Sequence, residues 1–585
     1  MPHTERLGTI SQDNWKAAFT KREFDDPVAY NHARAELQTI ERSRAFDAEE
    51  IAGASKIERD AAALVRRIRN YDYDNTYGKS HDAHGHPTGK RTQGEHFLGN
   101  VDLINKTQLM KVAKRMPKGA HLHIHFNSCL PAKFLIQQAR DIDAMYIRST
   151  LPLTSQANLD ASRISFMVMT YREATHVKEA HGKEHKVGLG DVFHPNYVCN
   201  RWMRYKQFQE QFELDVGNGE ILEGTSGAET WLERKMVISE EEAHGTHQTS
   251  RGIWEKFNYR TQMMKGLFAY ESAYRAYTRA CIRDFVADSI QYAEVRPNFM
   301  STNSLKTDDG TSSIGNEGIL KIIDDELKMT LEQLQKEGKY FGGMKVIYCT
   351  PRSFKRDQIK DALDECLELK KKYKTLLCGF DLVGHEEMGN ELHHFVPEFL
   401  NFQKKCKSEN IDIPFLFHCG ETLDVDGKVD GNLFDAVLLN AKRIGHGYAI
   451  ATHPLLMEIF KERKIAIESC PISNEILGLT PVIAGHHLPI LLANDVPCTI
   501  NSDNATFYKS SLSHDFYQVM IGSESMSLHG WKQLAKWSLE HSCMDPEQLT
   551  SVTEEWTRRW EEFCQWIVDE YGPMLQSWEP APGRH

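Results

Sequence analysis

Short apolar stretches recur along the chain, and each has the length and the β-branched or aromatic content of a single β-strand. They predict strands at residues 120–126, 291–297, 345–351, 378–384, 414–420, 442–447, 465–471 and 496–503. From the second stretch onward, amphipathic helical segments such as residues 317–338 separate them, which is the pattern of a βα repeat. Eight such repeats predict an α/β fold, the TIM (β/α)8 barrel.

The chain is longer than a barrel requires. A barrel takes about 250 residues, and this chain has 585. We expect an N-terminal helical arm over residues 1–95, a barrel over 96–570 and a tail over 571–585. The gap after the first strand is too long for a simple crossover and predicts an inserted subdomain at about 128–250. In the arm, residues 47–71 have a helical apolar stripe, which favours self-association as a homodimer.

Composition narrows the class of partner. The net charge is −12, and the lack of long basic runs argues against nucleic acid. No run of about 18 apolar residues predicts a membrane span, and residues 1–26 lack the apolar core of a signal peptide. The 12 scattered cysteines fit a reducing compartment. A glycosylation sequon stands at Asn504, where an attached glycan would block the predicted pocket. We expect a cytoplasmic protein that acts on a small molecule.

Four clusters of metal-binding residue types stand at the ends of predicted strands. They are HLHIH at 121–125, FHCGE at 417–421, RIGHG at 443–447 and NSDN at 501–504. A single cluster of this kind is more often structural than metal-binding. Because barrel active sites form at the carboxyl ends of the strands, the four together predict one metal centre.

Zinc takes imidazole and carboxylate ligands, and a catalytic zinc site keeps one position for water. Alternate residues of a strand share a face, so HLHIH offers His121, His123 and His125, and the spacing leaves open which two bind. His418 adds a third nitrogen and Asp503 an oxygen. A bound metal lowers the pKa of water from about 15.7 to about 7, which makes hydroxide available.

Hydrolysis also needs a proton donor and a group that orients the hydroxide. Glu421, three residues after His418, and His446 are the candidates. The other histidines stand among polar or turn-forming residues, which predicts solvated loops. They are the pair at 393 and 394, the pair at 486 and 487, and those of the loop 81–90.

Several blocks of the sequence, taken in order, resemble the adenosine deaminase superfamily and, within it, the growth-factor (adenosine deaminase 2-like) branch. The blocks are MPKGAHLHIH (116–125), AEVRP (293–297), GFDLVGHE (379–386), FHCGET (417–422), RIGHGYA (443–449), ESCPISN (468–474), NSDN (501–504) and LSHDFYQV (512–519). The likeness runs from about residue 96 to about residue 563, which is most of the chain. It implies a metal-dependent amidohydrolase type of barrel with one zinc ion per chain.

The resemblance also implies residue roles. The implied zinc ligands are His123, His125, His418 and Asp503. The implied catalytic residues are Glu421, which protonates the purine ring, His446, which orients hydroxide, and Asp503. Gly384 matches a glycine whose backbone amide meets the purine, and His385 beside it is a further candidate for substrate binding. In the growth-factor branch an N-terminal arm contributes to dimerisation, and its members are secreted, which is the alternative to a cytoplasmic location.

The chain departs from the family at two places. Asn504 stands where the family has a second carboxylate that addresses purine N7, and an amide NH2 can donate to that nitrogen at any pH. Phe126 stands where the growth-factor branch has a ribose-binding Asp, which leaves Asn127 as the nearest polar substitute. Trp254, in the helix before the second strand, either lines the pocket or packs in the core.

Three functional hypotheses follow. The leading one is hydrolytic deamination of adenosine or a closely related 6-aminopurine nucleoside. The runner-up is the same chemistry on another aminopurine, a nucleotide or an aromatic amine, because a fold and a metal do not fix the pocket. The third is a growth-factor-like binding protein with a vestigial site, against which the complete ligand set and Glu421 argue. The H-x-E and P-C-x-x-C pattern of the nucleic-acid deaminases is absent.

Overall fold

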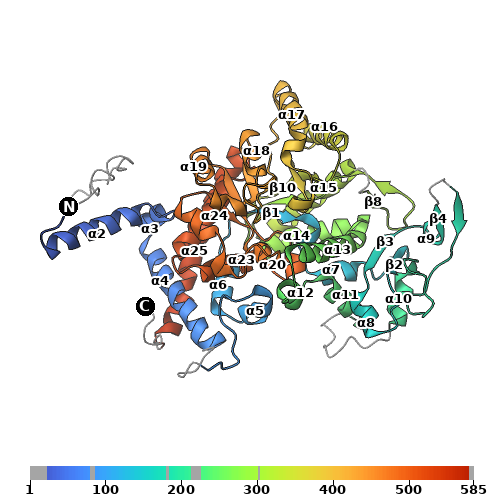
Figure 1. Cartoon of the computed structure of the whole chain (residues 1–585), viewed down its shortest axis with the longest axis horizontal. Coiled ribbons are helices and arrows are strands. Elements are labelled where there is room, and N and C mark those ends of the chain that lie inside the picture. The colour runs from blue at the N-terminus through green and yellow to red at the C-terminus, as the bar shows by residue number, and fades with distance from the viewer. Residues whose placement is uncertain are drawn as a thin grey trace.

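A computed structural model describes residues 23–78, 86–178, 183–212, 226–300, 304–576 and 578. Figure 1 shows a central barrel, with a helical arm on one side and a smaller sheet-containing part on the other. No helix among these residues is long and apolar enough to cross a membrane.

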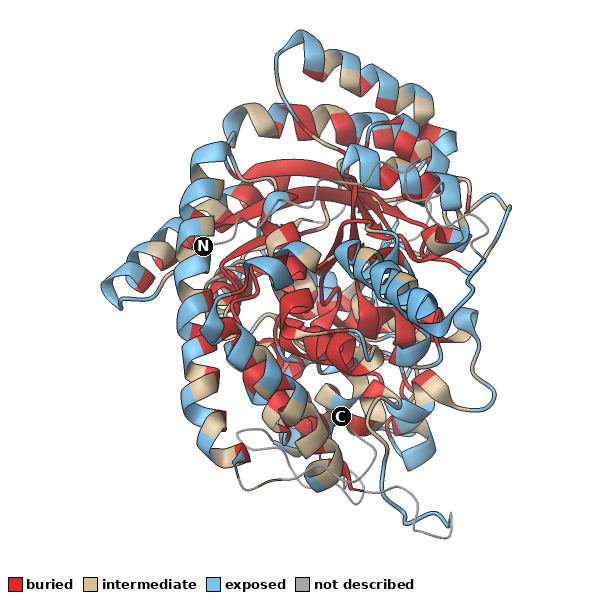
Figure 2. Ribbon diagram, turned by 90° about the vertical axis from the view of Figure 1, so that its left-hand side faces the viewer, coloured by how far each residue is buried: buried red, intermediate tan, exposed pale blue. Residues whose placement is uncertain are grey.

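Eight parallel strands form the barrel, as the apolar stretches predict. They are β1 (Ala120–His125), β7 (Tyr292–Arg296), β10 (Met344–Pro351), β11 (Leu377–Val383), β12 (His418–Cys419), β13 (Arg443–His446), β14 (Ala466–Ser469) and β15 (Cys498–Ile500). Nearly every residue in them is buried (Figure 2), because helices cover a parallel sheet on its outer face.

The strands pair as two sheets, β1-β7-β10-β11 and β12-β13-β14-β15. Single bridges connect the two sheets at both seams, Phe380 with Phe415 and Ile124 with Asp503. At the second seam, the backbone N–H of His125 donates to the carbonyl of Asp503 at 3.0 Å. The first and last strands therefore meet at the metal-ligand positions.

Helices follow the strands on the outside of the barrel. They are α15 (Asn316–Lys336), α16 (Arg356–Lys372), α17 (Val396–Ser408), α18 (Asn432–Leu438), α19 (Pro454–Arg463), α20 (Pro471–Ile476), α21 (Leu488–Ala493), α22 (Ala505–Tyr508), α23 (Leu512–Gly522), α24 (Leu528–Glu540) and α25 (Pro546–Leu575). A small hairpin, β8 (Leu305–Lys306) with β9 (Ser313–Ile314), precedes α15. Two helices, α5 (Phe97–Ile104) and α6 (Gln108–Arg115), lead into β1.

The chain between β1 and β7 includes a smaller, sheet-containing part beside the barrel (Figure 1). Its antiparallel sheet has the order β3-β2-β6, with β2 at Met145–Ser149, β3 at Ile164–Val168 and β6 at Met203–Arg204. A second hairpin pairs β4 (His176–Lys178) with β5 (Glu184–Lys186). The helices of this stretch are α7 (Ala132–Gln138), α8 (Gln156–Ala161), α9 (Tyr171–Thr175), α10 (Tyr205–Gln211), α11 (Gly227–Met236), α12 (Glu240–His244), α13 (Ser250–Phe268) and α14 (Glu271–Ala287).

The described part of the arm contains α2 (Pro27–Ser43), α3 (Ala48–Gly53) and α4 (Lys56–Asp72). Helices α3 and α4 attach to α24 through ion pairs: Glu50 and Glu58 both contact Lys532 at 3.0 Å. Helix α2 has no buried residue and extends away from the body (Figure 1). Its apolar side chains Val28 and Leu37 are exposed.

Candidate metal centre and substrate pocket

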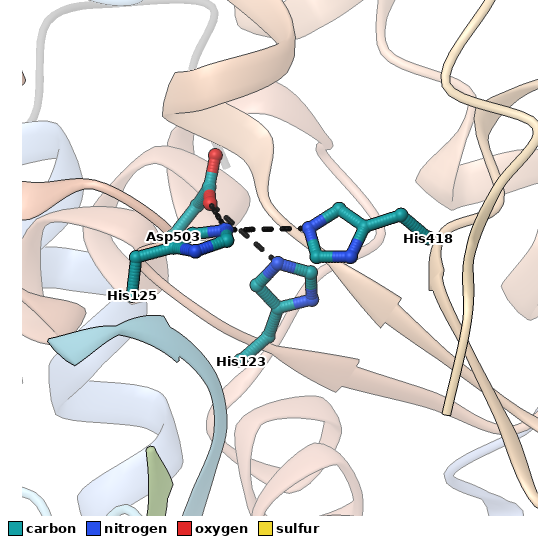
Figure 3. A group of neighbouring side chains, drawn as sticks. All are labelled: His123, His125, His418 and Asp503. Carbon is teal, nitrogen blue, oxygen red and sulfur yellow. Dashed lines mark hydrogen bonds and ion pairs between the residues drawn. The ribbon is translucent and has the colours of Figure 1, made fainter. Parts of the chain in front are cut away.

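Four side chains converge at the carboxyl ends of β1, β12 and β15: His123, His125, His418 and Asp503 (Figure 3). The Nε2 of His125 lies 3.2 Å from the Nε2 of His418 and 3.2 Å from an Asp503 oxygen. The Nε2 of His123 lies 3.5 Å from the same oxygen. Four ligands about 2.1 Å from a tetrahedral ion would be about 3.4 Å apart, so these spacings fit one zinc-sized ion.

The orientation of the rings tests whether a metal suits this site. The Nδ1 of His123 lies 2.8 Å from Glu468, and the Nδ1 of His418 lies 2.7 Å from Asp381. A carboxylate at Nδ1 holds the proton there and leaves Nε2 with a lone pair. Both Nε2 atoms face the centre of the group, where that of His123 has no hydrogen-bond partner. The residues therefore fit a cation.

His121 points elsewhere, which resolves the ambiguity of the HLHIH spacing. Its Nε2 accepts a hydrogen bond from the backbone N–H of Ser502 at 3.1 Å. Burial lowers the pKa of His121 to about 3, so its ring is neutral. It supports the strand end and lies outside the ligand group.

A buried ionic network lies behind the ligands. Arg296 donates to Asp381 at 2.9 Å and to Glu468 at 2.5 Å, and Arg443 donates to Glu468 and Glu294, both at 2.6 Å. All five side chains are fully buried. Although burial opposes it, the Arg296 and Arg443 charges hold the pKa of Glu468 well below its usual range. The network fixes the two carboxylates that orient the ligand histidines.

Glu421 follows the β12 ligand and faces the same cavity. Burial raises its pKa well above the usual value, and the nearby charges of Asp503 and Glu386 add to the increase. Glu386 positions it by accepting the backbone N–H of Gly420 at 3.1 Å and of Glu421 at 2.7 Å. The Glu421 side chain is therefore a carboxylic acid that can keep its proton at neutral pH.

His446 ends β13 beside Glu421, with its Nδ1 3.5 Å from the carboxylate. Its backbone has φ +60°, and Asp503 has φ +55°. Left-handed backbone is uncommon for residues other than glycine and recurs at functional sites. Burial lowers the pKa of His446 well below its usual value although the Asp503 charge opposes this, so the ring is a neutral hydrogen-bonding group.

Helix α20 holds both strained residues from outside. Ser473 donates to Asp503 at 2.7 Å, and the Asn474 side chain lies 3.2 Å from the Nδ1 of His446. The second oxygen of Asp503 contacts the ligand histidines, which lower its pKa despite its burial. One short helix thus orients a metal ligand and a candidate catalytic group.

A cavity of about 120 Å³ opens above the ligands. Its lining includes Glu421 and His446, together with the predicted substrate residues Gly384, Asn504, Asn127 and Trp254. Gly384 has φ +106°, a conformation in which glycine is favoured. His385 stacks on Trp254 with ring centroids 4.5 Å apart and does not line this cavity, because the indole lies against its ring. It therefore has a supporting position.

The two departures from the family have structural explanations. The Asn504 amide donates to Asp503 at 2.8 Å, and its oxygen accepts from Ser128 at 2.7 Å. The second N–H of the amide has no hydrogen bond within the described residues. Phe126 turns away from the cavity and is buried among aromatic rings, including Tyr274 and Tyr277. Asn127, the next residue, reaches the cavity lining.

The histidines assigned to solvated loops behave differently from one another. His393 is 78% exposed and contacts Asp435. His486 contradicts the prediction, because it is buried and its Nε2 lies 3.0 Å from the oxygen of Asn474. His487 stacks on Tyr448. The loop at 81–90 lies partly outside the described residues.

Sequence reasoning assigned no role to the residues that support the ligands. They are Glu294, Arg296, Asp381, Glu386, Arg443, Glu468, Ser473 and Asn474. One signal was available: a charged residue in the middle of an apolar strand, as in CGFDLVG and IAIESCP, must be paired when that strand is buried.

Comparison with known proteins indicates the family. Residues 234–558 match the family model described as adenosine deaminase. The chain is 30% identical to an adenosine deaminase of Phlebotomus duboscqi over 82% of this chain and 83% of that protein. It is 26% identical to human adenosine deaminase 2 over 80% of this chain and 82% of that protein.

The fold of a solved amidohydrolase from Burkholderia ambifaria with bound Zn is similar, at a TM-score of 0.50 and 14% identity over 79% of this chain and 96% of that one. The match to the family model covers more than half of the chain, and the likeness to the sequence relatives extends beyond it. The chain belongs to the adenosine deaminase family and is a metal-dependent aminohydrolase.

Proposed function

We propose that this enzyme hydrolyses the 6-amino group of adenosine, or of a closely related 6-aminopurine nucleoside, to the 6-oxo group with release of ammonia. The metal is zinc, one ion per chain. The observation that carries the proposal is the placement of a carboxylic acid, Glu421, and a neutral imidazole, His446, on one cavity with the four-ligand group. The names of the sequence relatives support the same activity.

The side chains divide the chemistry between them. Zinc held by the four-ligand group would supply Lewis acidity and lower the pKa of a bound water. Glu421 donates its proton to the ring nitrogen that gains electron density as the amine carbon is attacked. His446, held by Asn474, orients the attacking water through its ring nitrogen. Trp254, 8% exposed, covers the cavity and keeps bulk water out.

The purine is recognised by the backbone N–H of Gly384 and by the remaining N–H of Asn504, which donates to N7. A 7-deaza substrate places a C–H against that donor and should lose about 10-fold to 100-fold in kcat/KM. Asn504→Asp should make activity fall as pH rises, because an acid donates only while protonated. Indifference to both changes would remove Asn504 from substrate recognition.

An ammonia-release assay with the purified chain tests the function directly. Adenosine, deoxyadenosine, adenine and AMP should be compared by kcat/KM, and adenosine or its deoxy analogue should lead. Turnover of none of the aminopurines by a zinc-loaded protein would refute the proposal.

A second candidate substrate, an aminopurine nucleotide, is favoured by one observation. A second cavity adjoins the first and shares Asn127, Thr261 and Asn298 with it. Its lining includes Lys265 of α13, which forms no ion pair among the described residues. A cation at the far end of the substrate cavity suits the phosphate of a nucleotide.

The comparison of adenosine with AMP in Lys265→Ala distinguishes the two substrates. If the nucleotide is the substrate, kcat/KM for AMP should fall by about 10-fold or more, while kcat/KM for adenosine stays the same. Lys256→Ala is the matched control, because Lys256 stands on the same helix and contacts Glu242 at 3.8 Å. Equal effects on both substrates would exclude a phosphate contact.

A further inference from the structure

A second group of metal-binding side chains lies outside the catalytic cavity. It consists of His96, His244 and Glu475, whose nearest ligand atoms all lie within 4.8 Å of one another. The three come from separate parts of the chain: His96 precedes α5, His244 ends α12 and Glu475 belongs to α20. The imidazole rings stack, with centroids 3.8 Å apart.

One polar atom of each side chain in this group is buried without a hydrogen-bond partner. In the described chain, the Nδ1 of His96, the Nε2 of His244 and one oxygen of Glu475 have no hydrogen bond. The other oxygen of Glu475 accepts the backbone N–H of Phe97 at 2.7 Å. Three unsatisfied polar atoms in one place are costly, because each has given up its hydrogen bonds with water.

The spacings are slightly longer than those of the catalytic ligands. The Glu475 oxygen that accepts the Phe97 N–H lies 3.6 Å from the Nε2 of His244 and 3.9 Å from the Nδ1 of His96. Two ligand atoms of a tetrahedral zinc site are about 3.4 Å apart. A small inward shift of the side chains and an opening of the stacked rings would therefore let all three atoms bind one ion. Burial raises the pKa of Glu475 to about 8 and lowers that of His244 to about 4. A divalent cation would stabilise the carboxylate with neutral imidazole beside it.

We propose that His96, His244 and Glu475 form a second, non-catalytic site for a borderline divalent metal such as zinc. Two histidines and one carboxylate are a ligand set that zinc uses, with a water as the fourth ligand. The side chain of His96 is 35% exposed, which provides an entry path. The ion would join the segment before the barrel, the part inserted after β1 and helix α20.

This position gives the site a connection to catalysis. Glu475 directly follows Ser473 and Asn474, which hold Asp503 and His446. An ion at Glu475 would therefore stiffen the helix that orients one catalytic ligand and one catalytic group. Loss of the ion should loosen that helix and leave the four catalytic ligands in place.

Metal content of the full-length chain tests the proposal, measured by elemental analysis after equilibration with buffered zinc. Wild type should hold about two zinc ions per chain, and Glu475→Gln and His96→Ala should each hold about one. Cobalt substitution gives an independent signature, because the difference spectrum between wild type and Glu475→Gln should be that of one site with two nitrogen ligands. His393→Ala is the control, since His393 is an exposed histidine, and it should keep both ions.

The catalytic site serves as the internal reference. Asp503→Asn should lose the first ion and retain the second, which separates this proposal from the proposed deaminase activity. Added zinc should also raise the midpoint of thermal unfolding more in Asp503→Asn than in the double variant with Glu475→Gln. A wild-type content of about one zinc per chain, with a cobalt spectrum unchanged by Glu475→Gln, would overturn the second site.

Discussion

The carboxylate behind His418 offers the sharpest test of how the barrel prepares its metal site. Asp381 accepts the His418 ring N–H at 2.7 Å and the His418 backbone N–H at 2.9 Å, and it pairs with Arg296. Asp381→Asn keeps the volume of the side chain and removes its charge. An amide that turns its NH2 toward Nδ1 also places the ring proton on Nε2, the atom that faces the metal position.

Asp381→Asn should change both the metal affinity and the free energy of unfolding. Loss of a carboxylate that orients a metal-binding histidine typically weakens metal affinity by about 10-fold to 100-fold, or about 1.4 to 2.8 kcal/mol. Arg296 also loses one carboxylate at a fully buried position. Removing one partner of a buried ion pair costs about 3–5 kcal/mol. Because Arg296 keeps Glu468, the free energy of unfolding should fall by about 3 kcal/mol, the lower end of that range.

Zinc affinity can be measured by competition with a chromophoric chelator, and stability by urea unfolding of the zinc-free chain. Asp430→Asn is the matched control: Asp430 is a buried carboxylate 2.8 Å from the Nε2 of His453, away from the ligand group. The control should leave zinc affinity unchanged. A folded Asp381→Asn chain that binds zinc as tightly as wild type would refute the orientation argument.

Three further predictions use other parts of the molecule. Glu421→Gln should lower turnover by about 10²-fold to 10⁴-fold with metal content unchanged. Equal turnover in the variant and wild type would remove this acid from the mechanism. A signalling role that does not depend on catalysis would be unaffected by the substitution. Burial raises the pKa of Asp72 to about 6 from 3.8, so its contribution to stability is present below about pH 4 and lost as pH rises through 6. Urea unfolding of wild type relative to Asp72→Asn should therefore show a loss of about 3 kcal/mol between pH 4 and 7, and parallel pH profiles would contradict this. Deletion of residues 1–95 should convert a dimer to a monomer in sedimentation; an unchanged state would show that the arm does not mediate association.

The positions of the barrel strands could be predicted because parallel strands buried on both faces are continuous apolar stretches. The grouping of the four candidate ligands could be predicted because barrel sites lie where those strands end. The ionic network could not, since Arg296 and Glu468 are 172 residues apart and their pairing depends on the closure of the barrel. His486 was misassigned for a related reason: its polar neighbours in sequence say nothing of Asn474, which buries it.

The choice among the three histidines of β1 also required the structure. Spacing places all three on one face, but the backbone N–H of Ser502 donates to His121, which removes that ring from the ligand group. Gly445 then leaves room for His123, whose ring would lie 2.9 Å from any Cβ at that position. Neither effect is visible in a local pattern, because each depends on a neighbouring strand.

The seam between β1 and β15 affects how this protein is made. The backbone N–H of His123 donates to Asn501, 378 residues further along the chain. The first strand therefore cannot complete its hydrogen bonds until the last strand has been synthesised. Contacts of such sequence separation slow folding, and a ribosome adds about 5–20 residues per second. During that delay His123 and His125 lack their Asp503 partner, and the metal centre is among the last features to form. Zinc uptake should therefore follow completion of the barrel and mark newly synthesised chains that have folded.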